Sequence, residues 1–169
     1  MSGVESATAS AGAAQRTITR LYDALSRLDG DTMQACYAPA AQFDDEAFSL
    51  TGPAQIGGMW RMLCSTTQAK GRDVWRLDFR DVTDHSAHWE AHYRFSATGR
   101  MVHNIIDANI QCGPDGLIQR HRDSFDFWRW SRQALGASGL LLGWTSFLRN
   151  KVRAQAAANL ARFLASSPR

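Results

Sequence analysis

A histidine and an aspartate two positions apart, His121 and Asp123, have the clearest potential for chemistry in this chain. Side chains two positions apart on a strand point to the same face of the sheet, and Phe125 shares their parity. That face is apolar, where an ionised carboxylate is costly unless it is paired. Such carboxylates are common at sites of proton transfer. We predict that Asp123 acts as a general acid or base and that His121 relays its proton.

The pairing of neighbouring strands supports this assignment. Turn signals at residues 98–100 and 113–116 separate segments that alternate apolar and polar residues. The register they suggest puts Tyr93 opposite Asn104 and Ile106 opposite Asp123, with an apolar inner face and a polar outer face. We predict that Asn104 orients a ligand oxygen. The expected pocket wall consists of Tyr93, Trp89 and Phe125 from the sheet and Trp60 from a helix above it.

Other interpretations of the polar residues stay open. His121 and Asp123 could form a satisfied internal pair, or both could lie at a solvated edge of the sheet. Three histidines on the outer face have a spacing similar to that of metal ligands: His88, His92 and His103. Because they lack a third inward-facing ligand, we expect no metal site. We predict cross-strand pairs there instead, for example His103 with Asp126.

The secondary structure that must position these residues is predicted to change from helices to strands along the chain. Residues 16–28 show the spacing of an amphipathic helix, and a short second helix containing Tyr37 ends at Pro39. A short strand is expected at 41–44 and a third helix at 53–64. From Trp75 onward, apolar residues recur at every second position. This alternation predicts an antiparallel meander with one apolar face. Helices followed by a sheet define an α+β fold with the helices packed on that face.

Composition limits the classes of function. The chain has 169 residues, of which 44% are apolar and 21% charged, as in one folded domain. The net charge is +3, of which +6 lies in residues 130–169, so residues 1–129 carry −3. A mildly acidic body excludes a nucleic-acid-binding core. Three widely spaced cysteines predict buried thiols and a cytoplasmic location.

The chain is expected to have three parts. Residues 1–14 are Ala, Ser and Gly with almost no charge, which predicts a disordered tail. Residues 15–135 form the domain. Residues 136–169 form a C-terminal basic amphipathic helical extension, which could pack on the domain, cover a partner or rest on an anionic membrane surface. Packing on the domain is the interpretation we favour, because the apolar stripe of this helix is mostly alanine.

Three segments resemble the nuclear transport factor 2-like superfamily, in particular SnoaL-like polyketide cyclases and ketosteroid isomerase: residues 21–46, 51–63 and 116–130. The resemblance implies a cone-shaped fold, with N-terminal helices on a curved antiparallel sheet around a small-molecule pocket. It implies no cofactor and a hydrophobic small-molecule ligand. Because family members often dimerise through the outer face of the sheet, it also implies a homodimer.

The resemblance also suggests roles for particular residues. Residues 37–46 are similar to the run that precedes the base of ketosteroid isomerase, which implies Asp45 as a second acid–base candidate. The oxyanion tyrosine of that enzyme falls near Tyr22 after a one-residue gap, which implies a substrate contact. Its oxyanion aspartic acid falls on Ala108, which argues against ketosteroid isomerase activity. SnoaL-like cyclases use an aspartate near the end of the last long strand, which Asp123 resembles.

These observations predict an enzyme of the isomerase, cyclase, dehydratase or hydrolase type. It would act on a hydrophobic small molecule by proton transfer through Asp123, without a cofactor. A non-catalytic ligand-binding or dimerisation module is one alternative, because this fold hosts enzymes and non-enzymes alike. Membrane or partner binding through the C-terminal extension is the other.

Overall fold

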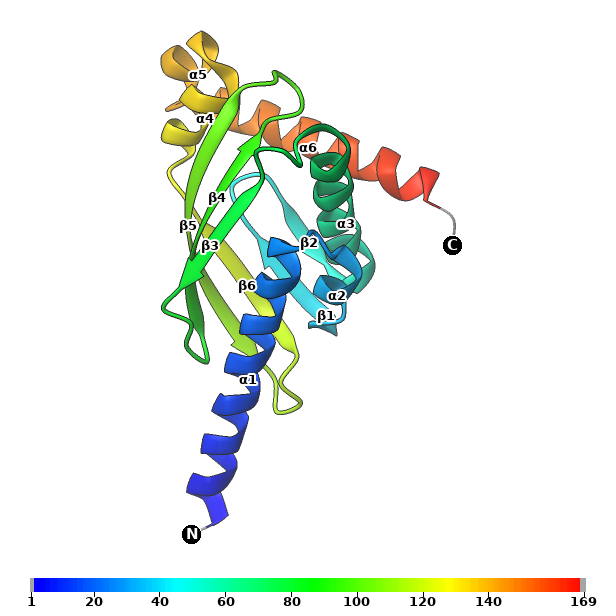
Figure 1. Ribbon diagram of the computed structural model, residues 1–169, viewed down its shortest axis with the longest axis vertical. Helices are drawn as coiled ribbons and strands as arrows, with labels where there is room; N and C mark the ends of the chain where they lie inside the picture. The colour runs from blue at the N-terminus through cyan, green and yellow to red at the C-terminus, as the bar shows by residue number, and fades with distance from the viewer. Residues whose placement is uncertain (1, 168–169) are drawn as a thin grey trace.

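The computed structural model describes residues 2–167, with side chains from residue 8 onward, and its elements follow an α+β order (Figure 1). The helices are α1 (Ser2–Ser26), α2 (Gly30–Gln34), α3 (Gly52–Lys70), α4 (Phe127–Leu135), α5 (Ala137–Leu142) and α6 (Ser146–Ser166). The strands are β1 (Tyr37–Asp44), β2 (Ser49–Thr51), β3 (Arg76–Arg80), β4 (Ser86–Arg94), β5 (Met101–Cys112) and β6 (Ile118–Ser124). The predicted α+β class is confirmed.

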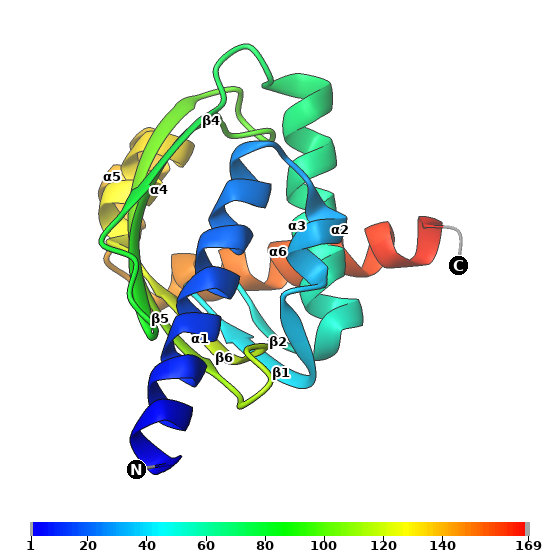
Figure 2. The ribbon, with the colours of Figure 1, turned by 60° about the horizontal axis from the view of Figure 1, so that its bottom comes forward.

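The strands form one curved sheet in the order β2-β1-β6-β5-β4-β3 (Figure 2). Strands β3 to β6 form the predicted antiparallel meander, and β2 is antiparallel to β1. The sheet is not wholly antiparallel, however, because β1 runs parallel to β6. The chain leaves β1, passes through α3 and the meander, and returns in the same direction, as a parallel partner requires. This crossover places Phe43 beside His121.

The register of the meander differs by two residues from the predicted one. Trp89 pairs with Ile106, and Asp123 pairs with Ala108. The difference arises at the turns, where the hairpin closes with a bond from the Phe95 amide to the Arg100 carbonyl and the register shifts next to Cys112. Because side chains alternate with period two, a two-residue slip leaves each on its predicted face. The apolar inner face is confirmed, whereas the individual cross-strand partners were wrong.

Helices α1, α2 and α3 cover the concave face of the sheet, as Figure 2 shows. Helix α1 buries Ile18 and Leu21 completely, and α3 buries Ile56 and Met59. Each such side chain stabilises the fold by about 1.5–3 kcal/mol relative to an exposed one. The main apolar core therefore lies on the side of the sheet that carries His121 and Asp123.

Helix α1 begins earlier than the sequence predicted. It starts at Ser2 and not at Arg16, so the predicted disordered tail at 1–14 is helical from Ser2 onward. Residue 1 lies outside the described residues. Alanine has the highest helix propensity of any residue, and the alanines of this segment extend the amphipathic helix backward.

Helix α4 replaces the end of the predicted last strand. It begins at Phe127, and the Asp126 carboxylate caps it by accepting a hydrogen bond from the Arg129 amide at 2.9 Å. Phe127 packs against Trp130 within the helix, with ring centroids 5.5 Å apart. Because Asp126 serves as the cap, the expected pair of His103 with Asp126 was wrong.

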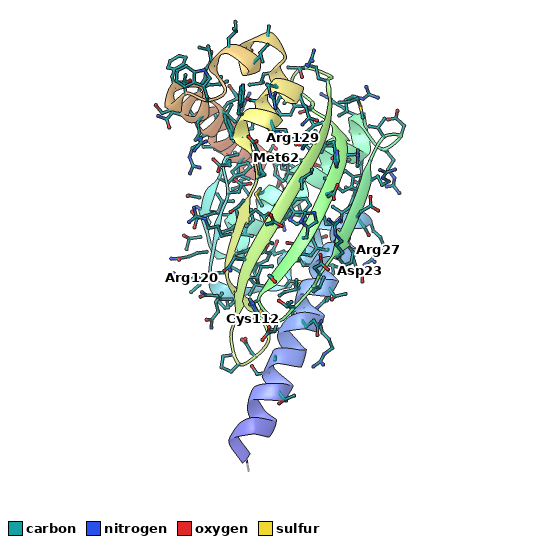
Figure 3. The ribbon with its side chains drawn as sticks, turned by 90° about the vertical axis from the view of Figure 1, so that its left-hand side faces the viewer. Asp23, Arg27, Met62, Cys112, Arg120 and Arg129 are labelled. Carbon is teal, nitrogen blue, oxygen red and sulfur yellow. The ribbon has the colours of Figure 1, made fainter. Side chains whose placement is uncertain are left out.

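The outer face of the sheet carries its own paired charges (Figure 3 views the molecule from this side). His103 Nε2 lies 2.7 Å from a carboxylate oxygen of Glu90, and His88 Nδ1 lies 2.7 Å from Asp107. The prediction of cross-strand pairs is thus confirmed in kind, with Glu90 in place of Asp126 as the partner of His103.

The C-terminal extension packs on the domain. Leu160 of α6 is buried in the main core, and Leu164 lies so close to Gly58 of α3 that a side chain at Gly58 would have to displace the Leu164 Cδ2 methyl group. The Arg153 guanidinium donates to the backbone carbonyls of Asp45 and Glu46 at 3.0 and 3.1 Å. Among the described residues, no helix is long and apolar enough to cross a membrane.

Candidate functional site

The centre of the candidate site is the pair formed by His121 and Asp123. His121 Nε2 lies 2.9 Å from Asp123 Oδ1, and the two residues are only 1% and 4% exposed. Strand β6 places both on the inner face because they are two positions apart. Phe43 of β1 packs edge-on against the His121 ring, with centroids 5.0 Å apart. An ionisable pair so enclosed must be held by hydrogen bonds.

Tyr37 and Trp60 continue this pair into a chain of hydrogen bonds. The Tyr37 hydroxyl lies 2.8 Å from His121 Nδ1, and Trp60 Nε1 donates to the Tyr37 oxygen at 3.1 Å. Burial raises the pKa of Tyr37 well above its usual value, so the phenol keeps its proton. An indole N–H can only donate, and therefore the Tyr37 proton points to Nδ1. With Nδ1 accepting from Tyr37, the His121 ring carries a proton on Nε2, facing Asp123.

Trp89 supplies a second hydrogen bond to the carboxylate. Its Nε1 donates to Asp123 Oδ1 at 3.4 Å, the same oxygen that faces His121. Among the described residues, both hydrogen bonds to this carboxylate end on Oδ1. The Asp123 oxygen Oδ2 therefore accepts no hydrogen bond from the described residues.

Tyr22 adds an unpaired hydroxyl to the cluster. It is fully buried, and its hydroxyl has no hydrogen-bond partner in the described part of the chain. Its ring packs against Trp89 with centroids 5.7 Å apart. Burial, and then the charge of nearby Asp123, raise the pKa of Tyr22 well above its usual value. An unpaired buried hydroxyl costs about 1–3 kcal/mol, a cost that a ligand oxygen would remove.

Asp45 lies at the start of the loop between β1 and β2. Its Oδ1 accepts hydrogen bonds from the amides of Ala47 and Phe48 at 2.7 and 2.6 Å. Burial raises its pKa to about 7, an effect that those two hydrogen bonds oppose and that the charge of Asp123 increases. A carboxyl group with such a pKa can both donate and accept a proton at neutral pH.

Three further predicted residues lie on the inner face toward α4. Asn104 is 8% exposed on β5 and pairs with Ala91. Tyr93 accepts a hydrogen bond from Trp130 Nε1 at 2.8 Å, and burial raises its pKa to about 12. Phe125 packs against the same Trp130 ring. The structure therefore groups Asp123, His121, Trp60, Trp89 and Tyr22, and places Asn104, Tyr93 and Phe125 further along the sheet.

Sequence reasoning missed Tyr37 as a site residue, because it was assigned to the second helix. In the structure Tyr37 begins β1, where parallel pairing with β6 brings it to His121. A local pattern cannot reveal a parallel pairing between strands so far apart. The signal available was Pro39, which disfavours a helical conformation for the residue before it and favours an extended one.

Two surface hollows of the structure lie outside this cluster. One of about 600 Å³ is lined by Arg100, Met101, Arg129, Arg132 and Gln133. A second of about 350 Å³ runs along α1 beside Asp23 and Arg27, which Figure 3 labels. Packed side chains enclose Asp123 and His121, so the small-molecule pocket stays a prediction.

The described residues contain no cluster of three or more His, Cys, Asp or Glu side chains arranged to hold a metal ion. Cys36 and Cys64 are buried free thiols, as the sequence predicted, and Cys112 is half-buried. Burial raises the pKa of the Cys36 thiol to about 11. These thiols are therefore protonated at neutral pH and are poor nucleophiles.

Comparison with known protein families identifies the class of this chain. The sequence model of the SnoaL-like domain matches residues 18–133, which is more than half of the chain. The protein belongs to the SnoaL-like family, within the nuclear transport factor 2-like superfamily. The comparison with curated proteins gives no match.

Solved structures with the same fold include proteins of different named activities. An LEH-like epoxide hydrolase from M. tuberculosis has a TM-score of 0.57 at 18% identity, over 78% of this chain and 97% of that one. A candidate polyketide cyclase from Silicibacter sp. TM1040 has a TM-score of 0.56 at 18% identity, over 71% of this chain and 93% of that one. A candidate isomerase from Bacillus subtilis has a TM-score of 0.57 at 15% identity, over 75% and 95%. Identities this low establish the fold and no particular reaction.

Proposed function

We propose that this protein is a cofactor-independent enzyme that transfers protons on an apolar small molecule, with Asp123 as its acid–base group. The observation that carries this proposal is the buried contact of 2.9 Å between His121 and Asp123. Two ionisable side chains in an apolar core are costly to maintain and concentrate at functional sites. The names of three structural neighbours, a candidate polyketide cyclase, a candidate isomerase and an epoxide hydrolase, are compatible with this class of reaction.

The hydrogen-bond chain suggests how Asp123 would work. With Tyr37 donating to Nδ1, His121 presents its Nε2 proton to Asp123 Oδ1. Asp123 then holds a carboxylate whose Oδ2 can take a proton from carbon or from water. His121 spreads the charge that remains on Oδ1, and Tyr37 keeps the ring in the required tautomer. Tyr37 and Trp60 act as positioning residues because they reach the reacting atoms only through His121.

Tyr22 and Asp45 would complete the chemistry. The unpaired Tyr22 hydroxyl can donate to a ligand oxygen on which negative charge develops. Asp45, with a pKa of about 7, can return the proton at a second position or take part in opening a ring. The apolar walls formed by Trp89 and Phe43 suit a ligand with little charge.

A non-catalytic ligand-binding module is the second candidate. One observation favours it: both ring nitrogens of His121 have hydrogen-bond partners within the fold. A histidine with both ring nitrogens hydrogen-bonded is also what a purely structural role would require. The two proposals differ in what Asp123→Asn does, because a binding module would keep its ligand and an enzyme would lose turnover.

The experiment is a turnover screen of the purified full-length chain. The panel contains aliphatic and cyclic epoxides, β,γ-unsaturated ketones and aromatic polyketide esters, followed by mass spectrometry of the products. We expect turnover in at least one class and its loss in Asp123→Asn. Asp107→Asn is the matched control, because Asp107 carries the same group on the outer face of β5. Ligand binding by both variants without turnover by the wild type would assign the protein to the second candidate.

A further inference from the structure

The most exposed large apolar side chains of the described residues gather where α5 meets α6. Trp144, Leu141 and Phe147 are 74%, 68% and 66% exposed. Exposed apolar groups that are contiguous mark surfaces that bind another molecule or a membrane. We call this set the elbow patch, and it consists of Leu140, Leu141, Leu142, Trp144 and Phe147.

The orientation of α5 is fixed by its packing on α4. Gly139 approaches Ser131 so closely that a side chain at Gly139 would clash with the Ser131 backbone. The Ser131 hydroxyl donates to the Gly139 carbonyl at 3.3 Å. With its glycine turned inward, α5 presents its leucines outward, at the end of the molecule where Figure 1 places α5. The exposure of the elbow patch is therefore built into the fold.

A hollow rich in arginine adjoins the elbow patch. Its volume is about 600 Å³, and Arg100, Arg129 and Arg132 line it. Arg129 and Arg100 donate to backbone carbonyls of His103 and Gln133 at 2.8 Å each, which holds their guanidinium groups in place. Among the described residues, no carboxylate forms an ion pair with any of these three arginines. Their charge is therefore available to an anionic partner.

Trp128 connects the hollow to the elbow patch. The Arg132 guanidinium lies 4.4 Å from the centre of the Trp128 ring, and Trp128 Nε1 donates to the Leu140 carbonyl at 3.2 Å. Figure 3 places Arg129 at the same end of the molecule as α4 and α5. The surface is thus continuous, with apolar side chains in the elbow patch and fixed positive charge beside it.

The distribution of charge along the sequence also favours an anionic partner. From residue 127 to the end of the sequence there is no Asp or Glu, while Arg129, Arg132, Arg149 and Lys151 lie close to the elbow patch in sequence. Arg149 is partly neutralised by Glu46 at 3.4 Å. A partner of this surface must therefore be negatively charged as well as apolar.

We propose that the elbow patch and the arginine hollow dock on the surface of a membrane that contains anionic phospholipids. Tryptophan, phenylalanine and leucine enter the interfacial layer, where an apolar body and a polar edge are both accommodated. The arginines of the hollow contact headgroup phosphates, which guanidinium groups bind in a bidentate manner. Because no described helix could span a membrane, this contact is peripheral.

A second copy of the chain fits this surface less well. In a two-fold symmetric contact the same patch faces itself, so the arginines of both hollows would be brought together. Like charges in such a contact cost binding free energy, whereas an anionic bilayer offers opposite charge across the whole surface. The proposal is independent of acid–base chemistry at Asp123 and holds if the protein is not an enzyme.

The test is sedimentation of the full-length chain with vesicles. One set contains phosphatidylcholine alone, and the other contains phosphatidylcholine mixed with phosphatidylglycerol. We expect binding to the mixed vesicles to exceed binding to the neutral ones by about tenfold or more, and to weaken as salt is raised. Equal binding to both, or no binding to either, would overturn the proposal.

Matched variants locate the contact. Leu141→Ser and Trp144→Ser are compared with Leu63→Ser, which changes an exposed leucine on α3. Arg132→Gln is compared with Arg162→Gln, whose guanidinium bonds within its own helix. We expect the three variants of the docking surface to lower binding to the mixed vesicles by about fivefold or more each. Unchanged vesicle binding, or a dimer that the same three variants abolish, would assign the patch to another role and contradict the proposal.

Discussion

The Tyr37 hydroxyl lies 2.8 Å from His121 Nδ1, and this contact joins side chains 84 positions apart in the chain. It exists because β1 runs parallel to β6 and begins at Tyr37. The phenol donating to Nδ1 and the carboxylate accepting from Nε2 both favour the tautomer of His121 that carries its proton on Nε2. The hydrogen bonding of the aspartate at the centre of the proposed site therefore depends on a residue of the neighbouring strand that is distant in sequence.

Replacing Tyr37 by phenylalanine tests this relationship. The ring remains, but His121 Nδ1 and the Trp60 indole N–H lose their shared partner. We expect Tyr37→Phe to lower the free energy of unfolding by about 1–3 kcal/mol. We also expect the nitrogen chemical shifts of the His121 ring to change, because Nδ1 loses the hydrogen bond that the Tyr37 hydroxyl donates.

The matched control is Tyr93→Phe, which removes a hydroxyl bonded to Trp130 and not to a histidine. It should destabilise the fold to a similar extent while leaving the His121 nitrogen shifts as in the wild type. Unchanged His121 shifts in Tyr37→Phe would contradict the proposed chain of hydrogen bonds.

Asp45 gives the fold a pH dependence of known sign. Its folded pKa of about 7 lies above the ordinary aspartate value of 3.8, so the folded state binds this proton more tightly than the unfolded state does. Stability therefore falls as pH rises between these two values and stays low above them. We expect the free energy of unfolding to fall by about 4 kcal/mol between pH 4 and pH 8 from this residue.

Denaturant unfolding at several pH values measures this effect. Asp45→Asn keeps the oxygen that accepts from the Ala47 and Phe48 amides but carries no charge. The free energy of unfolding of Asp45→Asn should not fall as pH rises, and this variant should be more stable than the wild type above pH 7. Asp78→Asn, on the exposed side of β3, should keep the wild-type profile. An Asp45→Asn profile that parallels the wild type would show that Asp45 does not titrate in this range.

The sequence predicted the faces of the sheet better than the partners across it. Alternation of apolar and polar residues placed Asn104, His121 and Asp123 inward, and all three are buried there. Turn signals did not fix the register, because one hairpin closes beyond its glycine and the other carries a bulge. A register error of two residues changes every cross-strand partner but leaves each side chain on its predicted face of the sheet.

Contacts of the site between residues far apart in the sequence could not be predicted from local sequence patterns. The parallel pairing of β1 with β6 depends on the path of the whole chain, so neither Tyr37 nor its contact with His121 could be derived from spacing. Arg153 was counted only as one charge of a basic tail, yet its guanidinium bonds the loop that carries Asp45. Such contacts follow from tertiary packing, which no periodicity of a single segment encodes.

Arg153 fixes α6 to the loop between β1 and β2. It donates to the carbonyls of Asp45 and Glu46 and to the Ser49 hydroxyl, at 3.0, 3.1 and 3.2 Å. We expect Arg153→Ala to lower the free energy of unfolding by about 1–3 kcal/mol, because two backbone carbonyls lose a charged donor. Amide hydrogen exchange in α6 and in residues 45–49 should become faster.

Arg162→Ala serves as the control for this change, because the Arg162 guanidinium bonds Ala158 and Asn159 of the same helix. It should leave exchange in residues 45–49 as in the wild type. Equal exchange rates in Arg153→Ala and Arg162→Ala would mean that Arg153 does not hold α6 to this loop.

The most direct measurement is kcat for Asp123→Asn on the first substrate that the wild type turns over. The account predicts a fall of about a hundredfold or more, with Asp107→Asn unchanged and thermal unfolding of Asp123→Asn still cooperative. If folded Asp123→Asn turns over that substrate at the wild-type rate, Asp123 is not the proton-transfer group and the proposed function is wrong.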